Sequence, residues 1–182
     1  MKITKLSVDF DNIVFDLEGR NIKEVKDIYD YDLKTREIAY WDYYYDHFPE
    51  VTKIWFDFAK YSQGKFFEGD IKFIQALKDT GLEVQIVTAS AESISEEKDL
   101  MIYERYGDIR VIHTKHKSEV TGNSILIDDG PHNIDCHIET HKLPAIIMDR
   151  DYGWSKNYTN ELVTKVKNYE ETLSTVHKII KG

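Results

Sequence analysis

Two aspartates one residue apart, Asp9 and Asp11, follow an apolar run near the start of the chain. Extended backbone sends alternate side chains to the same side, so these carboxylates project together and repel one another. A bound cation, or a reaction that uses both groups, would make the arrangement favourable. The alternative is a solvated loop after an edge strand, because an Asp-x-Asp pair by itself is common.

A second acidic pair, Asp128 and Asp129, follows another apolar run that begins at Ser124. In sheets of parallel strands, ligands bind beyond the carboxyl ends of the strands. If the two runs are adjacent strands, the two acidic pairs form one oxygen-rich site. Such a site suits Mg²⁺, which binds few protein carboxylates and keeps waters and substrate phosphate oxygens as its other ligands.

The composition limits the kind of protein that can carry such a site. The chain has 182 residues, of which 41% are hydrophobic and 13% aromatic, so it is globular and long enough for one domain and a subdomain. The formal net charge of −9 argues against extended nucleic acid as a partner, because no basic stripe neutralises phosphates. The single cysteine, Cys136, excludes an internal disulfide framework and suits a reducing compartment. Without a signal peptide or an apolar run of membrane length, we expect a cytoplasmic protein with no membrane partner. The composition leaves open whether two copies of the chain form a homodimer.

The order of apolar runs predicts how the acidic pairs are positioned. Strands alternate with helices, which is typical of an α/β fold with a parallel sheet flanked by helices. The expected strands are residues 3–8, 82–87, 111–113, 125–127 and 145–148. The expected helices are residues 70–79 with Asp70 as N-cap, a helix reaching residue 106 with a capping box at Ser93 and Glu96, residues 131–141, and residues 161–180 on an apolar stripe.

A segment rich in tyrosine, tryptophan and phenylalanine, residues 25–64, separates the first two strands. Tyr40, Tyr44 and Phe48 recur at helical spacing, which indicates two or so helices ending near Gly64. The rings would pack a small helical subdomain, or one or two of them would face the site and stack on a flat substrate such as a nucleobase. Residues 1–24 and 65–182 are then the α/β core.

Four strand ends carry polar groups in sequence order: the first acidic pair, Thr88, the lysines at 115 and 117, and the second acidic pair. Phosphoryl transfer needs this set. One carboxylate can attack phosphorus, and a second carboxylic acid can protonate the leaving oxygen and later deprotonate water. A hydroxyl, backbone N–H groups and a lysine can hold the phosphate oxygens, while Mg²⁺ lets two anions approach one another.

These motifs resemble those of the haloacid dehalogenase (HAD) superfamily of phosphotransferases and, within it, the 5'(3')-deoxyribonucleotidase family. Residues 8–12, 126–134 and 145–152 carry the resemblance, and residues 126–134 are the most family-specific run. The resemblance implies a Rossmann-like, HAD-like core with a small helical cap, residues 25–64, inserted after the first strand.

The resemblance also implies a role for each matching residue. Asp9 would be the nucleophile and Asp11 the general acid/base. The phosphate-binding residues would be Thr88, Ala89, Ser90 and Lys117, with Lys115 as the alternative lysine. The Mg²⁺ ligands would be Asp9, Asp11 through its backbone carbonyl, and Asp128, with Asp129 supporting them. Asn12 departs from the family's usual glycine, but asparagine tolerates a left-handed backbone better than most residues.

The predicted function is Mg²⁺-dependent hydrolysis of a phosphomonoester through an aspartyl-phosphate, with nucleoside monophosphates as the favoured substrates. One alternative is a phosphatase that acts on another small phosphoester or on a nucleic-acid end. Another is a non-catalytic sensor that binds a nucleotide or a metal. His137 and His141 are spaced like helical metal ligands, but no acidic or cysteine partner stands at zinc spacing, so we expect surface or hydrogen-bonded histidines.

Overall fold

The core is a six-stranded sheet in the order β5-β4-β1-β6-β7-β8, in which all neighbouring strands are parallel. The computed structural model describes residues 2–182, apart from the side chains of residues 156 and 157. The strands are β1 (Lys5–Val8), β4 (Glu83–Thr88), β5 (Arg110–His113), β6 (Ser124–Asp128), β7 (Ala145–Met148) and β8 (Val163–Val166). The predicted α/β fold class is confirmed.

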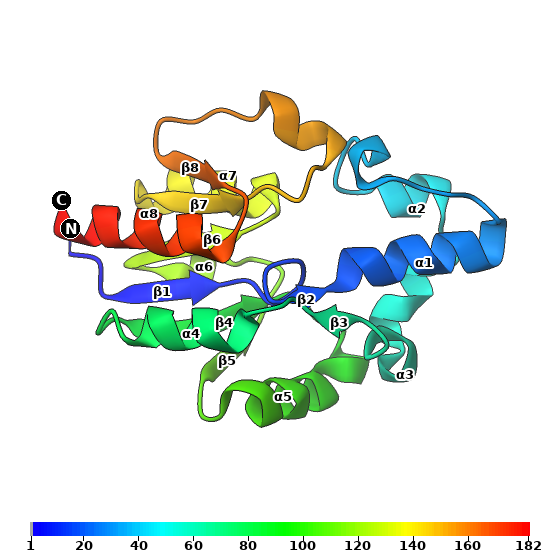
Figure 1. Cartoon of the computed structure of the whole chain (residues 1–182), viewed down its shortest axis with the longest axis horizontal. Helices are drawn as coiled ribbons and strands as arrows, with labels where there is room; N and C mark the ends of the chain where they lie inside the picture. Colours follow the sequence, from blue (N-terminus) through cyan, green and yellow to red (C-terminus); the bar gives the residue numbers. More distant parts are fainter. Residues whose placement is uncertain (1) are drawn as a thin grey trace.

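Helices flank this sheet, as Figure 1 shows. They are α4 (Asp70–Lys78), α5 (Glu92–Tyr106), α6 (Ser118–Thr121), α7 (Pro131–His141) and α8 (Tyr169–Lys181). Because helices cover the sheet, its central strands are buried almost throughout, and Leu6, Ile86 and Ile127 are fully buried. Among residues 2–182, no helix combines the length and the apolar character that crossing a membrane requires.

Strand β1 lies where the strand order reverses. The chain passes from β1 to β4 and β5 on one side, and then crosses to β6, β7 and β8 on the other. In open parallel sheets, ligands bind in the crevice outside the carboxyl ends of the strands at such a reversal. The carboxyl ends of β1, β4 and β6 are therefore the expected place for a site.

The aromatic segment is an insertion beyond the end of β1 (Figure 1). Short antiparallel strands β2 (Phe15–Asp16) and β3 (Lys65–Phe66) frame it. Between them lie α1 (Leu17–Tyr29), α2 (Tyr43–His47), α3 (Phe58–Tyr61), and the 3₁₀ helices η1 (Thr35–Glu37) and η2 (Val51–Phe56). A further 3₁₀ helix, η3 (Gly153–Asn157), follows β7. The boundary expected between residues 24 and 25 falls inside α1.

The single helix expected over residues 161–180 is wrong in its first part. Residues Val163–Val166 form β8, which pairs with β7, and helix α8 starts only at Tyr169. Asn168 separates the two elements, since its side chain accepts a hydrogen bond from the Glu171 N–H and caps the helix. The apolar spacing runs across this boundary, but pairing with the edge of the sheet decides the strand.

Two predicted helix caps are also wrong. Helix α4 begins at Asp70 itself, with Gly69 as its N-cap, and the Asp70 carboxylate accepts hydrogen bonds from Arg105 instead. The expected capping box at Ser93 is absent from α5, because the Ser93 hydroxyl donates to the carbonyl of Phe56. In both cases a distant contact takes the polar group that local sequence assigns to the helix end.

Candidate active site

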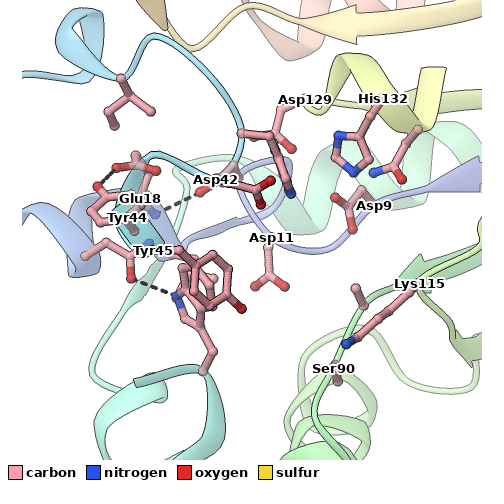
Figure 2. A pocket seen from close by; sticks show the side chains of 18 of the residues that line it. Asp9, Asp11, Glu18, Asp42, Tyr44, Tyr45, Ser90, Lys115, Asp129 and His132 are labelled. Atoms are coloured by element: carbon pink, nitrogen blue, oxygen red, sulfur yellow. Dashed lines mark hydrogen bonds between the residues drawn. The ribbon is translucent and has the colours of Figure 1, made fainter. Parts of the chain in front are cut away.

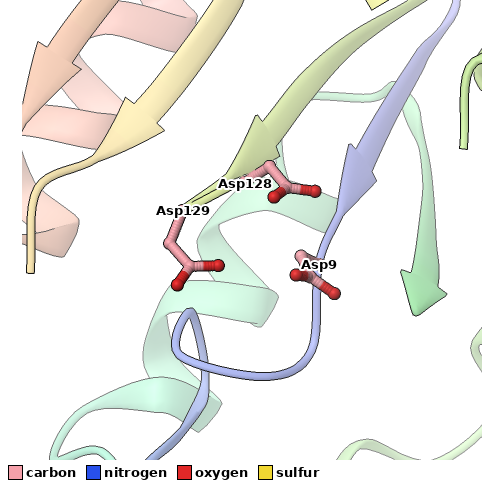
Figure 3. A group of neighbouring side chains, drawn as sticks. All are labelled: Asp9, Asp128 and Asp129. Atoms are coloured by element: carbon pink, nitrogen blue, oxygen red, sulfur yellow. The ribbon is translucent and has the colours of Figure 1, made fainter. Parts of the chain in front are cut away.

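Three aspartates from two adjacent strands form a buried cluster (Figure 3). Asp9 follows β1 directly, Asp128 ends β6, and Asp129 comes next. One oxygen from each carboxylate lies within 4.8 Å of the others. Within the described part of the chain, the buried Asp129 Oδ1 has no hydrogen-bond partner. An all-oxygen cluster with an unpaired buried acceptor fits a metal site of the type that Mg²⁺ prefers.

The cluster is electrostatically strained. Burial raises the pKa of Asp9 well above its ordinary value; Lys117 opposes this shift, and the neighbouring carboxylates add to it. Burial and the charge of Asp128 raise the pKa of Asp129 to about 7. A divalent cation at this position would relieve the repulsion and hold all three groups in their ionised form.

Lys117 completes the cluster. Its Nζ lies 2.8 Å from Asp9 Oδ2 and 2.7 Å from Asp128 Oδ2. Burial by itself would lower the pKa of this lysine, but the charges of Asp128 and Asp9 outweigh burial and hold the pKa above its ordinary value. Lys115, the alternative lysine, is exposed at the cavity wall near Ser90 (Figure 2). The structure thus brings Lys117 into the carboxylate cluster and leaves Lys115 outside it.

Two histidines hold the short helix α6, which starts next to Lys117. His141 Nε2 lies 2.6 Å from the Ser118 carbonyl oxygen, and His137 Nδ1 lies 2.9 Å from Thr121 Oγ1. Burial lowers the pKa of His137 to about 4, so the ring is neutral near pH 7. Both histidines, which were expected to be surface or hydrogen-bonded residues, are hydrogen-bonded, and His137 is buried.

Asp11 lies outside the cluster and contacts a residue that sequence reasoning missed, Lys98 on α5. The Lys98 Nζ lies 2.7 Å from Asp11 Oδ2 and 2.8 Å from Thr88 Oγ1. A sequence signal exists, because Ile94, Lys98 and Ile102 recur every four residues, and all three are buried on one face of α5. A lysine inside an apolar stripe is expected to have a buried partner.

The segment after β4 lines the cavity with Ala89 and Ser90, two of the predicted phosphate-binding residues. Ser90 Oγ is buried and has no hydrogen-bond partner among the described residues, so it can bind an incoming oxygen. Thr88, in contrast, is fully buried, and its side chain contacts Lys98 and Asp11.

The loop that follows Asp11 is held by another residue that was not singled out as part of the site, Arg150. Asn12, which stands where the family usually has glycine, has a φ of 57° and so adopts the left-handed conformation that glycine and asparagine tolerate. Arg150 donates hydrogen bonds to the carbonyl oxygens of Asn12, at 2.6 Å, and Ile13, at 2.9 Å. The Asn12 side chain in turn accepts from the Glu18 N–H at 2.8 Å, so the loop is tied to α1.

A cavity of about 400 Å³ extends from Asp9 into the inserted segment. Figure 2 shows Asp9, Lys115 and Ser90 on one side and Tyr44, Tyr45 and Glu18 on the other. Most of its aromatic lining comes from the insertion, namely Tyr40, Trp41, Tyr44, Tyr45, Trp55, Phe56 and Tyr61, and the segment after β7 adds Tyr152 and Trp154. The Glu18 carboxylate accepts a hydrogen bond from the Tyr44 hydroxyl, and burial raises the pKa of Glu18 to about 7.

Several solved structures share this fold at low identity, so they bear on the fold alone. A predicted phosphatase from Clostridium acetobutylicum has a TM-score of 0.60 and 14% identity, covering 98% of this chain and 100% of its own. A haloacid dehalogenase-like family hydrolase from Xanthomonas campestris has a TM-score of 0.59 and 10% identity, covering 99% and 97%. A HAD-superfamily hydrolase from Ehrlichia chaffeensis has a TM-score of 0.50 and 16% identity, covering 99% of both chains.

The parallel sheet with its helical insertion is the HAD-like fold of these structures, and the family match of residues 2–179 identifies a HAD-type phosphatase. Residues 2–179 match the family described as 5' nucleotidase, deoxy (pyrimidine), cytosolic type C protein, and the chain belongs to this family. The resemblance inferred from the sequence motifs is confirmed. No curated protein sequence matches the chain.

Proposed function

We propose that this phosphatase hydrolyses nucleoside monophosphates in an Mg²⁺-dependent reaction, as a 5'(3')-deoxyribonucleotidase. The observation that carries the proposal is the arrangement of the cavity, which has the Asp9 carboxylate on one side and the rings of Tyr44 and Tyr45 on the other (Figure 2). A phosphate suits the first side, and a flat base suits the second. The family description, which names a deoxy (pyrimidine) 5' nucleotidase, supports the same substrate class.

Asp9, Asp128 and the backbone carbonyl of Asp11 would hold Mg²⁺, with Asp129 supporting them. The bound ion would offset the negative charges of the carboxylates and the substrate phosphate. The buried carboxylate cluster and its unpaired Asp129 oxygen support this assignment.

The reaction would proceed in two steps at Asp9. A carboxylate oxygen of Asp9 forms a bond to phosphorus while the ester P–O bond breaks, and Asp11 gives its proton to the leaving oxygen. Asp11 then takes a proton from a water molecule whose oxygen attacks phosphorus. The bond between phosphorus and Asp9 breaks, which releases phosphate and restores both carboxyl groups.

The phosphate oxygens would be held by residues of two strand ends. Lys117 would bind them through its ammonium, Ser90 through its hydroxyl and Ala89 through its backbone N–H. Thr88 would act indirectly. Its hydroxyl accepts a hydrogen bond from the Lys98 ammonium, so it would help to hold the lysine that pairs with Asp11.

The remaining proposals concern location and organisation. We place the protein in the cytoplasm, which the cytosolic type of its family supports. The division into a core of residues 1–24 and 65–182 and a cap of residues 25–64 stays a prediction, as does a homodimer.

The test is phosphate release from a panel of nucleoside 5'- and 3'-monophosphates, with and without Mg²⁺. Asp9→Asn should abolish turnover, because the amide keeps the shape and removes the nucleophile. Turnover that needs Mg²⁺ and Asp9 would support the mechanism, and the order of substrates would show what the aromatic lining selects. Cleavage of a generic phosphomonoester but of no nucleotide would favour another small ester or a nucleic-acid end. Mg²⁺ binding without any cleavage would favour the sensor.

A further inference from the structure

The inserted segment touches Asp11 directly through one side chain. Tyr61, the last residue of α3, is 2% exposed, and its hydroxyl donates a hydrogen bond to Asp11 Oδ1. Burial, followed by the charge of Asp11, raises the pKa of Tyr61 well above its ordinary value, so the phenol keeps the proton it donates. Of the two oxygens of Asp11, one is therefore held from the insertion.

The other oxygen of Asp11 is held from the core. Lys98 Nζ lies 2.7 Å from Asp11 Oδ2, and the Thr88 hydroxyl lies 3.4 Å from the same atom. The Lys98 ammonium also lies 5.1 Å from the ring centroid of Tyr61, within the range of a cation–π contact. Tyr61 thus contacts both Asp11 and the lysine that pairs with it.

The Tyr61 ring is fixed in place by its neighbours. It stacks on Phe15 of β2 with ring centroids 5.1 Å apart, and Phe58 lies beside it at 6.3 Å. A buried ring that is packed on two sides cannot follow a rotation of Asp11, so its hydroxyl defines one orientation of that carboxyl group. Catalytic groups must keep their orientation closely, and a misplacement of about 1 Å can cost about a hundredfold in rate.

We propose that Tyr61 is a positioning residue for Asp11, through which the inserted segment takes part in the acid step as well as enclosing the substrate. The inference rests on the proposed function, because it takes Asp11 as the group that protonates the leaving oxygen. A nucleoside alkoxide is a poor leaving group and needs that proton. The p-nitrophenolate ion leaves without protonation, so its ester reports the same phosphoryl transfer without the acid step.

The experiment compares Tyr61→Phe with the wild type on two substrates. They are p-nitrophenyl phosphate and the nucleoside monophosphate that the wild type hydrolyses fastest. The variant removes only the hydroxyl and keeps the ring that packs on Phe15 and Lys98. We expect kcat/KM, which reports steps through cleavage of the ester bond, to fall at least about tenfold for the nucleotide and to stay within about twofold for p-nitrophenyl phosphate.

One control variant and one packing variant accompany this comparison. Tyr158→Phe removes a phenol hydroxyl that donates a hydrogen bond to Asp135, on α7, and should leave kcat/KM unchanged for both substrates. Phe58→Leu keeps the Tyr61 hydroxyl but removes one of the two rings that fix it, so it should lower kcat/KM for the nucleotide more than for p-nitrophenyl phosphate, and by less than Tyr61→Phe does.

Three results for Tyr61→Phe would overturn the proposal: kcat/KM that falls by the same factor for both substrates, kcat/KM that falls for neither, or protein that no longer folds. The proposed function fails separately, if the wild type cleaves neither ester or if Asp9→Asn retains activity.

Discussion

The ammonium of Lys98 lies 2.7 Å from the carboxylate of Asp11, although the two residues come from α5 and from the loop after β1. The Lys98 side chain is 1% exposed and that of Asp11 is 17% exposed, so water screens the pair little. Removing one partner of a buried ion pair leaves the other charge without compensation. The pair therefore ties the proposed acid/base to the core.

Lys98→Met should lower kcat/KM for phosphomonoesters by about a hundredfold, because Asp11 loses its charged donor and the Thr88 hydroxyl loses the donor that it accepts from. It should also lower the free energy of unfolding by roughly 3 kcal/mol. Steady-state kinetics and urea denaturation measure the two effects. Lys72→Met, an exposed lysine on α4, is the matched control. Unchanged kinetics in Lys98→Met would mean that the pair serves stability alone.

Lys117 and Lys115 should differ sharply when each is replaced by methionine. Lys117 lies between two buried carboxylates, so Lys117→Met should reduce kcat/KM by about 10²–10³ and destabilise the fold by about 3–5 kcal/mol. Lys115 is exposed at the cavity wall, and Lys115→Met should change kcat/KM by less than about fivefold. A larger loss of kcat/KM in Lys115→Met than in Lys117→Met would make Lys115 the phosphate-binding lysine.

Glu18 should make the fold less stable as the pH rises. Burial raises its pKa from 4.5 to about 7 in the folded protein, so between these values the folded state binds the proton more tightly than the unfolded chain. The free energy of unfolding then falls with rising pH, by on the order of 3 kcal/mol in total. Glu18→Gln stays neutral and should lack this part of the dependence. Urea denaturation at pH 5 and pH 8 measures it, with the exposed Glu104→Gln as control. Equal pH slopes in the wild type and Glu18→Gln would contradict the prediction.

Mg²⁺ should stabilise the folded protein as well as activate it. A ligand that binds only the folded state adds about 2.7 kcal/mol at a concentration of 100 times its Kd. Thermal unfolding with Mg²⁺ or with EDTA should therefore show a higher Tm with the metal. Asp128→Asn should reduce this shift, because it removes a charge from the cluster. An identical Tm in both conditions for the wild type would argue against a metal at this cluster.

The residues that follow the strands were predictable because their signals are local. An apolar run that ends in Asp9 or Asp128 marks both a buried strand and the polar group at its carboxyl end, and parallel pairing brings such ends together. The family resemblance added Ser90 and Lys117, which the structure places at the cavity and in the carboxylate cluster. The helical insertion was evident from its aromatic content.

Contacts between distant segments were decided only by the tertiary structure. Three side chains from separate parts of the chain donate hydrogen bonds to the loop after β1, and no local pattern relates them to it. They are Lys98, Tyr61 and Arg150. Strand β8 likewise depends on the edge of β7, which outweighs the helical spacing of its own residues. Local sequence determines which groups end each strand, because backbone geometry repeats over a few residues. Which side chains orient those groups depends on packing across the whole chain.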